Sequence, residues 1–416
     1  MKIAIIGTGI SGLSAAYKLH STHEITVFES ADRIGGHTAT MDINLHGEKY
    51  AIDTGFIVYN DWTYPNFIKL MRDLKVESVS TEMSFSVSCE KTGLEYGGNN
   101  LDTLFAQRKN LVNLPYLAML KDIVNFNKNA IRDLESGHLD EATTLGEYLQ
   151  QQGYGSLFAS HYLIPMGSAI WSSTLAEMLD FPLVFFVRFF KNHGLLSVNN
   201  RPQWRVIKGG SKAYLAPLTA AFADRIHLNA RIHHVVRSKE SVEIHFEDQT
   251  SESFDQVIFA CHSDQALTLL SDPSLAEQHI LEAMPYRMNE VVLHTDDRIL
   301  PTAKKAWSSW NYHLGEDSNR PATLSYNMNI LQGIESDTTF VVTLNAANKI
   351  AEEKVLGRYH YAHPVFTLAG IQAQGRWSEI NGVNNTWFCG AYWRNGFHED
   401  GCMSGIRVAD KIKGML

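Results

Sequence analysis

The first thirty residues alternate between short apolar runs and polar or glycine-rich breaks. Ile3 to Ile6 is an apolar run without a polar interruption, which is typical of a strand buried on both faces of a parallel sheet. Apolar residues from Leu13 to Leu19 recur at helical spacing, and Glu24 to Phe28 forms a second strand-like run. The pattern therefore predicts a strand, a helix and a second strand in succession, the usual start of a parallel α/β sheet.

The hydrophobic period changes after this unit. Residues Thr38–Tyr50 predict a hairpin with its turn at His46-Gly47, and the region from about Thr63 to His193 has mainly helical spacing. We therefore expect a largely helical insertion after the first sheet strands. Its clearest signals are helices at Phe67–Leu74 and Leu114–Leu134, a helix start at Thr144 with Glu147 in the first turn, and one strand at Ser84–Ser88.

Strand patterns return in the second half of the chain. The region from about Tyr286 to Gln374 predicts an antiparallel sheet, and the chain ends with a strand at Thr386–Gly390 and a helix beginning at Cys402. The other strands are expected at His227–Val235, Val242–Phe246, Asp255–Cys261, Glu290–Thr295, Ala322–Asn327 and Phe340–Asn345.

The stretch Phe181–Phe190 is strongly apolar and aromatic. One interpretation is a buried helix that lines a pocket. The other is an element on a membrane surface or at a lipid entrance. The sequence favours the first interpretation and leaves the second open.

A glycine pattern lies between the first strand and the first helix. Gly7, Gly9 and Gly12 form G-x-G-x-x-G in the strand–loop–helix context that binds a dinucleotide pyrophosphate. The N-terminus of the following helix would face the phosphates with unpaired N–H groups. Glu29 ends the second strand, where a carboxylate suits the hydroxyl groups of a ribose.

Composition and charge argue against several kinds of partner and site. The 416 residues carry a formal net charge of −9, which argues against a nucleic-acid partner. The four cysteines are widely separated, so they predict neither a zinc site nor a disulfide framework, and we expect no metal. No stretch reaches the roughly 18 apolar residues of a membrane span. We expect a cytoplasmic protein, with peripheral contact at the inner membrane face as an open alternative.

The segment Arg33-Ile34-Gly35-Gly36 indicates which dinucleotide the glycine loop binds. It resembles the R-x-G-G signature of the flavin amine oxidase superfamily, which includes monoamine oxidases, phytoene desaturases and protoporphyrinogen oxidases. The resemblance implies FAD. It extends to Gly209-Gly210 before a helix and to the final S-G-x-x-x-A at Ser404–Ala409. Most members carry an acid directly after Gly390, where this chain has Ala391, so that cofactor contact is in doubt.

The resemblance and the glycine pattern together give a set of expected FAD contacts. FAD is expected to be noncovalent, because neither Cys402 nor His37 lies in an attachment motif. The expected contacts are Gly7, Gly9, Ile10, Ser11, Gly12, Glu29, Ser30, Arg33, Gly35, Gly36, His37, Thr38, Thr54, Gly55, Phe56, Val235, Ala260, Gly390, Asp400, Gly401 and Met403.

The resemblance also implies an organisation. We expect an α/β fold in which a Rossmann-type FAD-binding domain interleaves with an α+β substrate domain. The first would comprise residues 1–60, 200–280 and 365–416, and the second 61–199 and 281–364. More narrowly, His363–Phe366, Trp204–Tyr214 and Gly390–Asp400 are similar to a bacterial subgroup associated with cyclopropane-fatty-acid-synthase-like methyltransferases, which includes methyl-fatty-acyl desaturases.

Three classes of function remain open. The first is dehydrogenation of a fatty acyl or methyl-fatty-acyl chain, which the apolar stretch Phe181–Phe190 favours. The second is amine oxidation with release of hydrogen peroxide, which usually employs a lysine near flavin N5. No motif places such a lysine here. The third is a flavoprotein without catalysis. The substrate is thus expected to be a small molecule or a lipid, and the oligomeric state stays open.

Four side chains are the candidates for chemistry. His398 and Glu399 precede the terminal helix, and an imidazole can donate or accept a proton near neutral pH. Trp310 and Tyr326 belong to the region expected to cover the flavin. We therefore predict that these residues border the reacting centre, with His398 as the acid or base.

Overall fold

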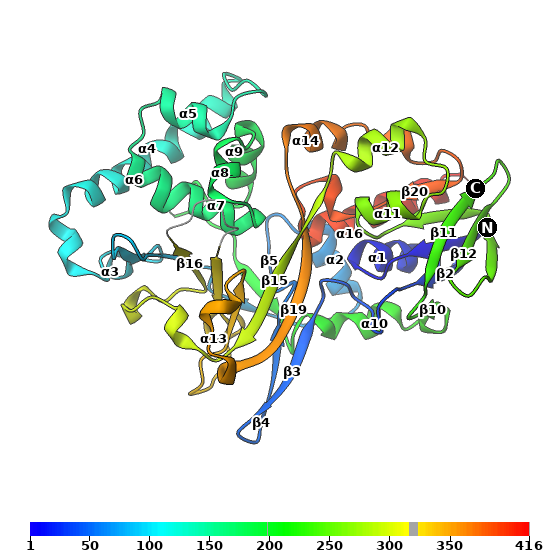
Figure 1. The fold of residues 1–416 in the computed structure, drawn as a ribbon, viewed down its shortest axis with the longest axis horizontal. Coiled ribbons are helices and arrows are strands. Elements are labelled where there is room, and N and C mark those ends of the chain that lie inside the picture. The colour runs from blue at the N-terminus through cyan, green and yellow to red at the C-terminus, as the bar shows by residue number, and fades with distance from the viewer. Residues whose placement is uncertain (198, 316–322, 416) are drawn as a thin grey trace.

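The computed structural model describes residues 1–197, 199–315 and 323–415. A parallel sheet with strand order β10-β2-β1-β14-β20 forms the part of the molecule that carries both chain ends (Figure 1). This arrangement confirms the expected α/β class with a parallel sheet. The strands are β1 (Lys2–Ile6), β2 (Glu24–Phe28), β10 (Ile226–His227), β14 (Gln256–Phe259) and β20 (Thr386–Phe388).

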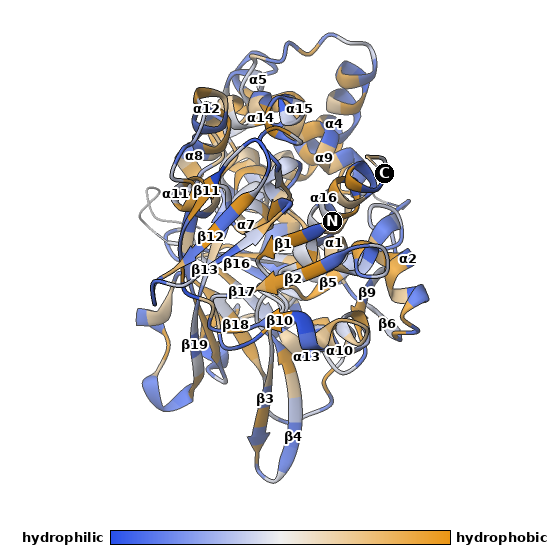
Figure 2. Ribbon diagram, turned by 90° about the vertical axis from the view of Figure 1, so that its right-hand side faces the viewer, coloured by the Kyte–Doolittle hydropathy of each residue, from blue (hydrophilic) through white to orange (hydrophobic). Residues whose placement is uncertain are grey.

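The parallel sheet is buried because its strands are apolar throughout. Ile3, Ile5, Val257 and Ile258 are fully buried at its centre, as expected for strands covered on both faces. Figure 2 shows β1 and β2 as hydrophobic ribbons inside the molecule. Helices α1 (Ile10–Leu19) and α16 (His398–Lys413) pack against each other beside this sheet.

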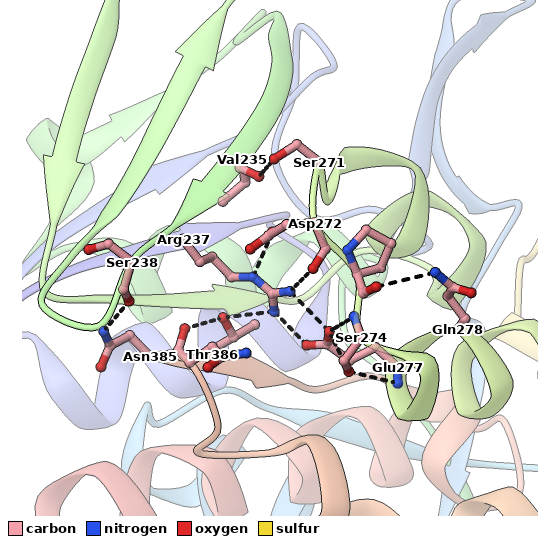
Figure 3. Close-up of polar contacts among 12 residues, drawn as sticks. Val235, Arg237, Ser238, Ser271, Asp272, Ser274, Glu277, Gln278, Asn385 and Thr386 are labelled. Atoms are coloured by element: carbon pink, nitrogen blue, oxygen red, sulfur yellow. Dashed lines mark hydrogen bonds and ion pairs between the residues drawn. The ribbon is translucent and has the colours of Figure 1, made fainter.

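A three-stranded antiparallel sheet follows β10 along the chain. Its strands are β11 (Ile232–Arg237), β12 (Val242–Phe246) and β13 (Ser251–Phe254). Arg237 at the end of β11 forms a buried ion pair with Glu277 of α12 (Leu275–Glu282) (Figure 3). Its Nη1 and Nη2 donate to the two carboxylate oxygens at 2.5 and 3.0 Å. Both side chains are 1% exposed, so neither charge has water to replace its partner.

The second large sheet has the strand order β19-β15-β18-β17-β16-β7-β8 and is antiparallel except between β16 and β7. It confirms the expected antiparallel sheet, with two strands contributed from the first hundred residues. The strands are β7 (Phe85–Cys89), β8 (Glu95–Gly97), β15 (Tyr286–His294), β16 (Trp310–Leu314), β17 (Thr323–Asn327), β18 (Val341–Leu344) and β19 (Val355–Pro364). The expected strand start at Ala322 lies outside the described residues.

Smaller sheets join these two parts. The predicted hairpin is confirmed as β3 (Thr40–Leu45) and β4 (Glu48–Asp53), with His46 and Gly47 at positive φ in its turn. The hairpin extends away from the body of the molecule (Figure 2). A further sheet contains β5 (Val58–Asn60), β9 (Trp204–Ile207) and β6 (Ser78–Thr81). The sequence pattern did not indicate β6 or β8, which are short and polar.

A helical insertion stands beside the seven-stranded sheet (Figure 1). The predicted start at Thr144 is confirmed, because its side chain and that of Glu147 form a capping box. The insertion contains α3 (Leu101–Leu104), α4 (Leu114–Glu135), α5 (Leu145–Gln151), α6 (Ser156–Phe158), α7 (Ile164–Trp171), α8 (Leu175–Leu179) and α9 (Leu183–Asn192). Helix α2 (Pro65–Asp73), expected as part of it, packs instead against α16 beside the parallel sheet. Later in the chain follow α10 (Leu215–Thr219), α11 (Ser263–Leu269), α13 (Met328–Gln332), α14 (Leu368–Gln374) and α15 (Trp377–Ile380).

The aromatic stretch Phe181–Phe190 belongs to the core of this insertion. Phe186 and Phe190 are buried on α9 and stack at 4.0 Å between ring centroids. Phe181 stacks on Trp171 at 4.6 Å. The segment is therefore a largely buried helix, as the first interpretation expected, whereas its lining of a pocket and its contact with a lipid or membrane stay predictions. Within the described ranges, no helix is long and apolar enough to cross a membrane.

The last helix begins earlier than predicted. We expected a loop through Gly401 and a helix from Cys402, whereas α16 starts at His398. The reason is a local cap, because Asp400 accepts a hydrogen bond from the backbone N–H of Phe397 at 2.9 Å. His398, Glu399 and Asp400 therefore lie in the first helical turn.

The Arg237–Glu277 pair predicts a strong stability effect. Glu277→Ala should remove the fully buried carboxylate of the pair, leave the guanidinium only the half-exposed Asp272 at 3.0 Å, and cost about 3–5 kcal/mol. Glu379→Ala is the matched control, because it removes the exposed partner of Arg376 on α15 and should cost less than about 1 kcal/mol. Thermal unfolding of both variants provides the comparison. Equal melting temperatures would contradict the role assigned to the buried pair.

Candidate functional site

The N-terminus of α1 is an open cradle. Gly9 caps the helix without a side-chain hydrogen bond, and the first turn carries no acidic residue. A Cβ added to Gly9 would have no atom within 4 Å. By contrast, a Cβ on Gly12 would lie 2.0 Å from the carbonyl oxygen of Gly7. Gly12 is therefore required by packing, whereas Gly9 leaves space in front of the helix for another molecule.

Glu29 lies beside this cradle at the end of β2. One carboxylate oxygen accepts hydrogen bonds from the backbone N–H of Thr8 at 3.0 Å and from the Thr8 hydroxyl. The other accepts from the N–H of Ala31 at 2.9 Å and from Ser30 at 3.4 Å. These bonds fix the carboxylate next to the glycine loop, where its remaining lone pairs can accept from a ligand hydroxyl.

The Arg33–Thr38 loop closes over the cradle. Gly35 and Gly36 have positive φ, and a Cβ on Gly36 would lie 3.3 Å from Cα of Gly9. The Arg33 guanidinium donates to the carbonyl oxygens of Gly36 at 3.0 Å and Thr38 at 3.2 Å. Arg33 therefore stabilises the loop in this structure, in addition to the positive charge that it brings near the cradle.

Asp53 joins the β3–β4 hairpin to the segment after β9 and to α13, through contacts that the sequence alone did not reveal. Its buried carboxylate accepts from Thr40 at 2.6 Å, from the N–H and hydroxyl of Ser211 at 2.8 and 2.9 Å, and from Gln332 of α13 at 3.1 Å. Burial raises the pKa of Asp53 to about 6, although these hydrogen bonds oppose the shift. The following residue, Thr54, is hydrogen-bonded to Tyr361 of β19 at 2.8 Å.

His398 is packed against the segment that contains Phe56. The two rings stack with centroids 3.7 Å apart, and Nε2 of His398 is 2.8 Å from the Tyr214 hydroxyl. Tyr214 is in turn hydrogen-bonded to Thr38 at 2.5 Å. Burial lowers the pKa of His398 to about 3, with a smaller contribution from the charge of His37. A neutral imidazole of such low basicity lends no electrostatic support to the predicted acid–base role, which stays a prediction.

Glu399 and Asp400 act within the fold. Glu399 accepts from the N–H groups of Asn66 and Phe67 at 3.0 and 2.8 Å, so it caps the N-terminus of α2 from a different helix. Burial raises the pKa of Asp400 to about 7, against the effect of its bond from Phe397. The structure thus gives both acids protein partners, and their predicted catalytic and cofactor contacts stay predictions.

Trp310 and Tyr326 lie on neighbouring strands of the seven-stranded sheet. Their rings meet at 86° with centroids 5.2 Å apart. The Trp310 Nε1 is buried and has no hydrogen-bond partner among the described residues. Both rings are half-buried and pack against the aromatic core of the helical insertion. They therefore form a mainly apolar junction between sheet and insertion.

The other predicted cofactor residues fall into two groups. Val235 is fully buried on β11, and its carbonyl already accepts from Ser271, so its contact with a ligand stays a prediction. The rest make close contacts with neighbouring segments of the chain. Ala260 lies against Gly7 and Gly12, Gly390 donates to Ser404 at 3.1 Å, Gly401 faces Ile10, Gly55 meets the carbonyl of His37, and Met403 contacts Arg394 at 3.3 Å.

The described residues fit the phosphates and a ribose of a dinucleotide. The open Gly9 position, the uncapped helix and the neighbouring Glu29 together supply a phosphate site and a ribose acceptor. Sequence reasoning missed a group of histidines near Gly36, because residues 37, 262 and 363 are far apart in the chain. Among the described residues, no three potential ligands are arranged to hold a metal ion.

Comparison with known proteins indicates a flavin cofactor. Residues 10–333 match the family model "Flavin containing amine oxidoreductase". The L-amino-acid oxidase of Demansia vestigiata is 20% identical over 348 residues, which cover 80% of this chain but only 64% of that protein.

Two solved structures share the fold over nearly their whole length. A putrescine oxidase variant has a TM-score of 0.72 at 15% identity, with 100% of this chain and 99% of that chain covered. A CLA-producing fatty acid isomerase from P. acnes has a TM-score of 0.69 at 16% identity, with 100% and 98% covered. With most of its length matched by the family model, the chain belongs to the flavin-containing amine oxidoreductase family.

Proposed function

We propose that this oxidoreductase dehydrogenates an apolar carbon chain, specifically a fatty acyl or methyl-fatty-acyl group. The observation that carries the proposal is the lack of a buried lysine in the part of the chain that the structure describes. Amine oxidation in the related enzymes usually employs a lysine near flavin N5. The seven-stranded sheet, which borders the substrate side, contains none in its described strands.

The surroundings of Trp310 and Tyr326 support an apolar substrate. These rings pack against a cluster in which Trp171, Phe181 and Phe189 are buried. Such a lining would bind a hydrocarbon chain by excluding water from it. The fatty acid isomerase found among the similar folds shows that this architecture accommodates a fatty acid in at least one other protein.

Amine oxidation is the second candidate. The perpendicular Trp310–Tyr326 pair would serve as one side of an aromatic cage around an amine, and putrescine oxidase shares the fold. A flavoprotein without catalysis is the remaining alternative. Each class predicts a different result in the same flavin-reduction experiment.

The residues would have separate roles in binding FAD and in stabilising charge. The α1 N-terminus and Gly9 would hold the phosphates, and Glu29 would accept from the ribose hydroxyls. Bound FAD would supply the hydride acceptor. The N-terminus of α16, which begins at the buried His398, would place its positive dipole end toward negative charge. The stacked Phe56–His398 pair would keep this helix end against the Thr54–Phe56 segment.

Anaerobic flavin reduction tests the choice of substrate. The purified protein should lose its oxidised-flavin absorbance when mixed with phospholipids that carry methyl-branched acyl chains, and the product should contain a new double bond. A panel of primary amines is the matched challenge, with hydrogen peroxide as the readout after air is admitted. Reduction by an amine alone would overturn the lipid proposal, and reduction by neither class would favour a non-catalytic flavoprotein.

Gly9→Ala tests the cofactor cradle separately. The backbone of Gly9 is at φ −63° and ψ 174°, which alanine adopts freely, and the added methyl would meet no protein atom. The apoprotein should therefore keep its melting temperature while FAD binding weakens by about 1–3 kcal/mol, because the methyl enters the ligand space. Gly12→Ala is the contrasting variant and should lose stability. Unchanged FAD affinity in Gly9→Ala would contradict the proposed cradle.

We also propose peripheral contact with an anionic lipid surface through the α3–α4 patch, defined as Leu101, Leu111, Val112 and Leu114. Val112 and Leu114 are 82% and 76% exposed. Basic side chains border the patch although the whole chain is acidic, which favours an anionic surface over a second copy of the protein. These exposed neighbours are Arg108, Lys109 and Lys305, of which Arg108 and Lys305 share Asp102.

Vesicle sedimentation provides the measurement. The protein should pellet with vesicles that contain phosphatidylglycerol and not with pure phosphatidylcholine, and added salt should weaken the binding. Val112→Asp should abolish pelleting, whereas Leu275→Asp, at a 72% exposed position on α12, should not. Equal pelleting of the two variants, or a concentration-dependent dimer that disappears only in Val112→Asp, would contradict the lipid assignment.

A further inference from the structure

Three histidines from distant parts of the chain meet at one place. His37 follows Gly36, His262 precedes α11, and His363 lies near the end of β19. The ring centroid of His37 is 5.5 Å from that of His363 and 6.1 Å from that of His262. His37 is one of the expected FAD contacts, whereas the function proposed above assigns no role to His262 or His363.

The histidine cluster (His37, His262 and His363) borders the glycine cradle. Gly36 packs against Gly9, and consecutive Cα atoms are about 3.8 Å apart, so His37 is only one residue removed from the open position. On the other side, Ala260 packs against Gly7 and Gly12, and His262 follows two residues later. The cluster thus flanks the space that the pyrophosphate of FAD would enter.

The surroundings hold these rings in place. An imidazole nitrogen of His37 bonds to the backbone of Ala362, and Nδ1 of His363 is 2.9 Å from the hydroxyl of Ser172 at the end of α7. His262 stacks on Tyr286 of β15 at 4.0 Å. Tyr361 of β19 contacts His37 with ring centroids 5.4 Å apart. Each histidine therefore has a fixed position and retains capacity for a further partner.

Burial disfavours the charged form of all three imidazoles, which a bound anion would favour. Burial lowers the pKa of His37 to about 3 and that of His363 to about 4, and the neighbouring imidazoles lower both further. Burial also lowers the pKa of His262, against the effect of Asp264. Each of the three residues nevertheless keeps part of its surface accessible. Arg33 adds a fixed positive charge that opposes protonation of His37.

We propose that the histidine cluster binds the pyrophosphate of FAD and takes up a proton from solvent when it does so. The inference rests on the proposed FAD site. The step is a simple protonation in which an imidazole becomes imidazolium and no covalent bond in FAD changes. The negative charge of the pyrophosphate would favour the imidazolium form, which burial disfavours in the free protein.

The sign of the pH dependence follows from linkage. An anion within about 4–6 Å favours imidazolium, so the bound state holds more protons than the free state. The gain is present in full below the pKa of the free histidine and is lost as pH rises through the higher pKa of the complex. FAD affinity should therefore increase as pH falls, by up to about tenfold per pH unit for each proton taken up.

Titration calorimetry of the apoprotein measures the proton directly. FAD binding at about pH 6 should release heat that depends on the ionisation enthalpy of the buffer, which reports net proton uptake, and the dependence should fade by about pH 8.5. Binding of FAD with no buffer dependence would overturn the inference while leaving the FAD site intact. Failure of FAD to bind at all would instead overturn the proposed function.

Variants and a second ligand locate the proton. His37→Gln and His363→Gln should each reduce the uptake by at least about half. His193→Gln should not, although burial also lowers the pKa of His193 to about 4 in the helical insertion. ADP-ribose, which carries the pyrophosphate without the isoalloxazine, should give the same uptake as FAD. Uptake with FAD alone, or uptake that disappears in Asp400→Asn and persists in both cluster variants, would contradict the pyrophosphate assignment.

Discussion

The structure depends on backbone contacts that leave no room for a side chain. A Cβ on Gly12 would lie 2.0 Å from the carbonyl oxygen of Gly7, and one on Gly405 would lie 2.0 Å from that of Ser11. These two contacts bring β1, α1 and α16 together around the same point. Because α1 must lie this close to both neighbours, its N-terminus is fixed at the edge of the parallel sheet where a phosphate can reach it.

A buried charge then couples this point to the rest of the molecule. Asp53 receives hydrogen bonds from the hairpin, from the segment after β9 and from α13 of the substrate side. Burial disfavours the charged carboxylate and raises the pKa of Asp53 to about 6. The folded state therefore binds this proton more tightly than the unfolded state, so the free energy of unfolding decreases as pH rises from the pKa of the unfolded chain through about 6. Complete hydrogen bonding offsets the cost, because an unpaired buried carboxylate would be far more destabilising. The Asp53 carboxylate thus fixes the hairpin, the segment after β9 and α13 relative to one another.

The sequence predicted those features that depend on local order along the chain. The glycine loop, Glu29, the hairpin and the burial of Phe186 and Phe190 follow from spacing and hydrophobic pattern, and the structure contains each of them. The start of α16 was predicted too late in the chain. The glycines around it suggested a loop, whereas the hydrogen bond from Phe397 to Asp400 caps a helix that already begins at His398. Glu399 was a candidate for chemistry, and its contact with α2, more than three hundred positions away, could not be predicted from the sequence. The histidine cluster was invisible for the same reason.

The most direct test of this account is the identity and attachment of the cofactor. Denaturing the purified protein in acid and analysing the supernatant by mass spectrometry should yield intact FAD, because the cradle at Gly9 offers a phosphate site without a covalent anchor. Flavin that stays with the precipitate would contradict noncovalent binding. A protein without flavin, even after incubation with FAD, would contradict the central claim that the space at α1 is a dinucleotide site.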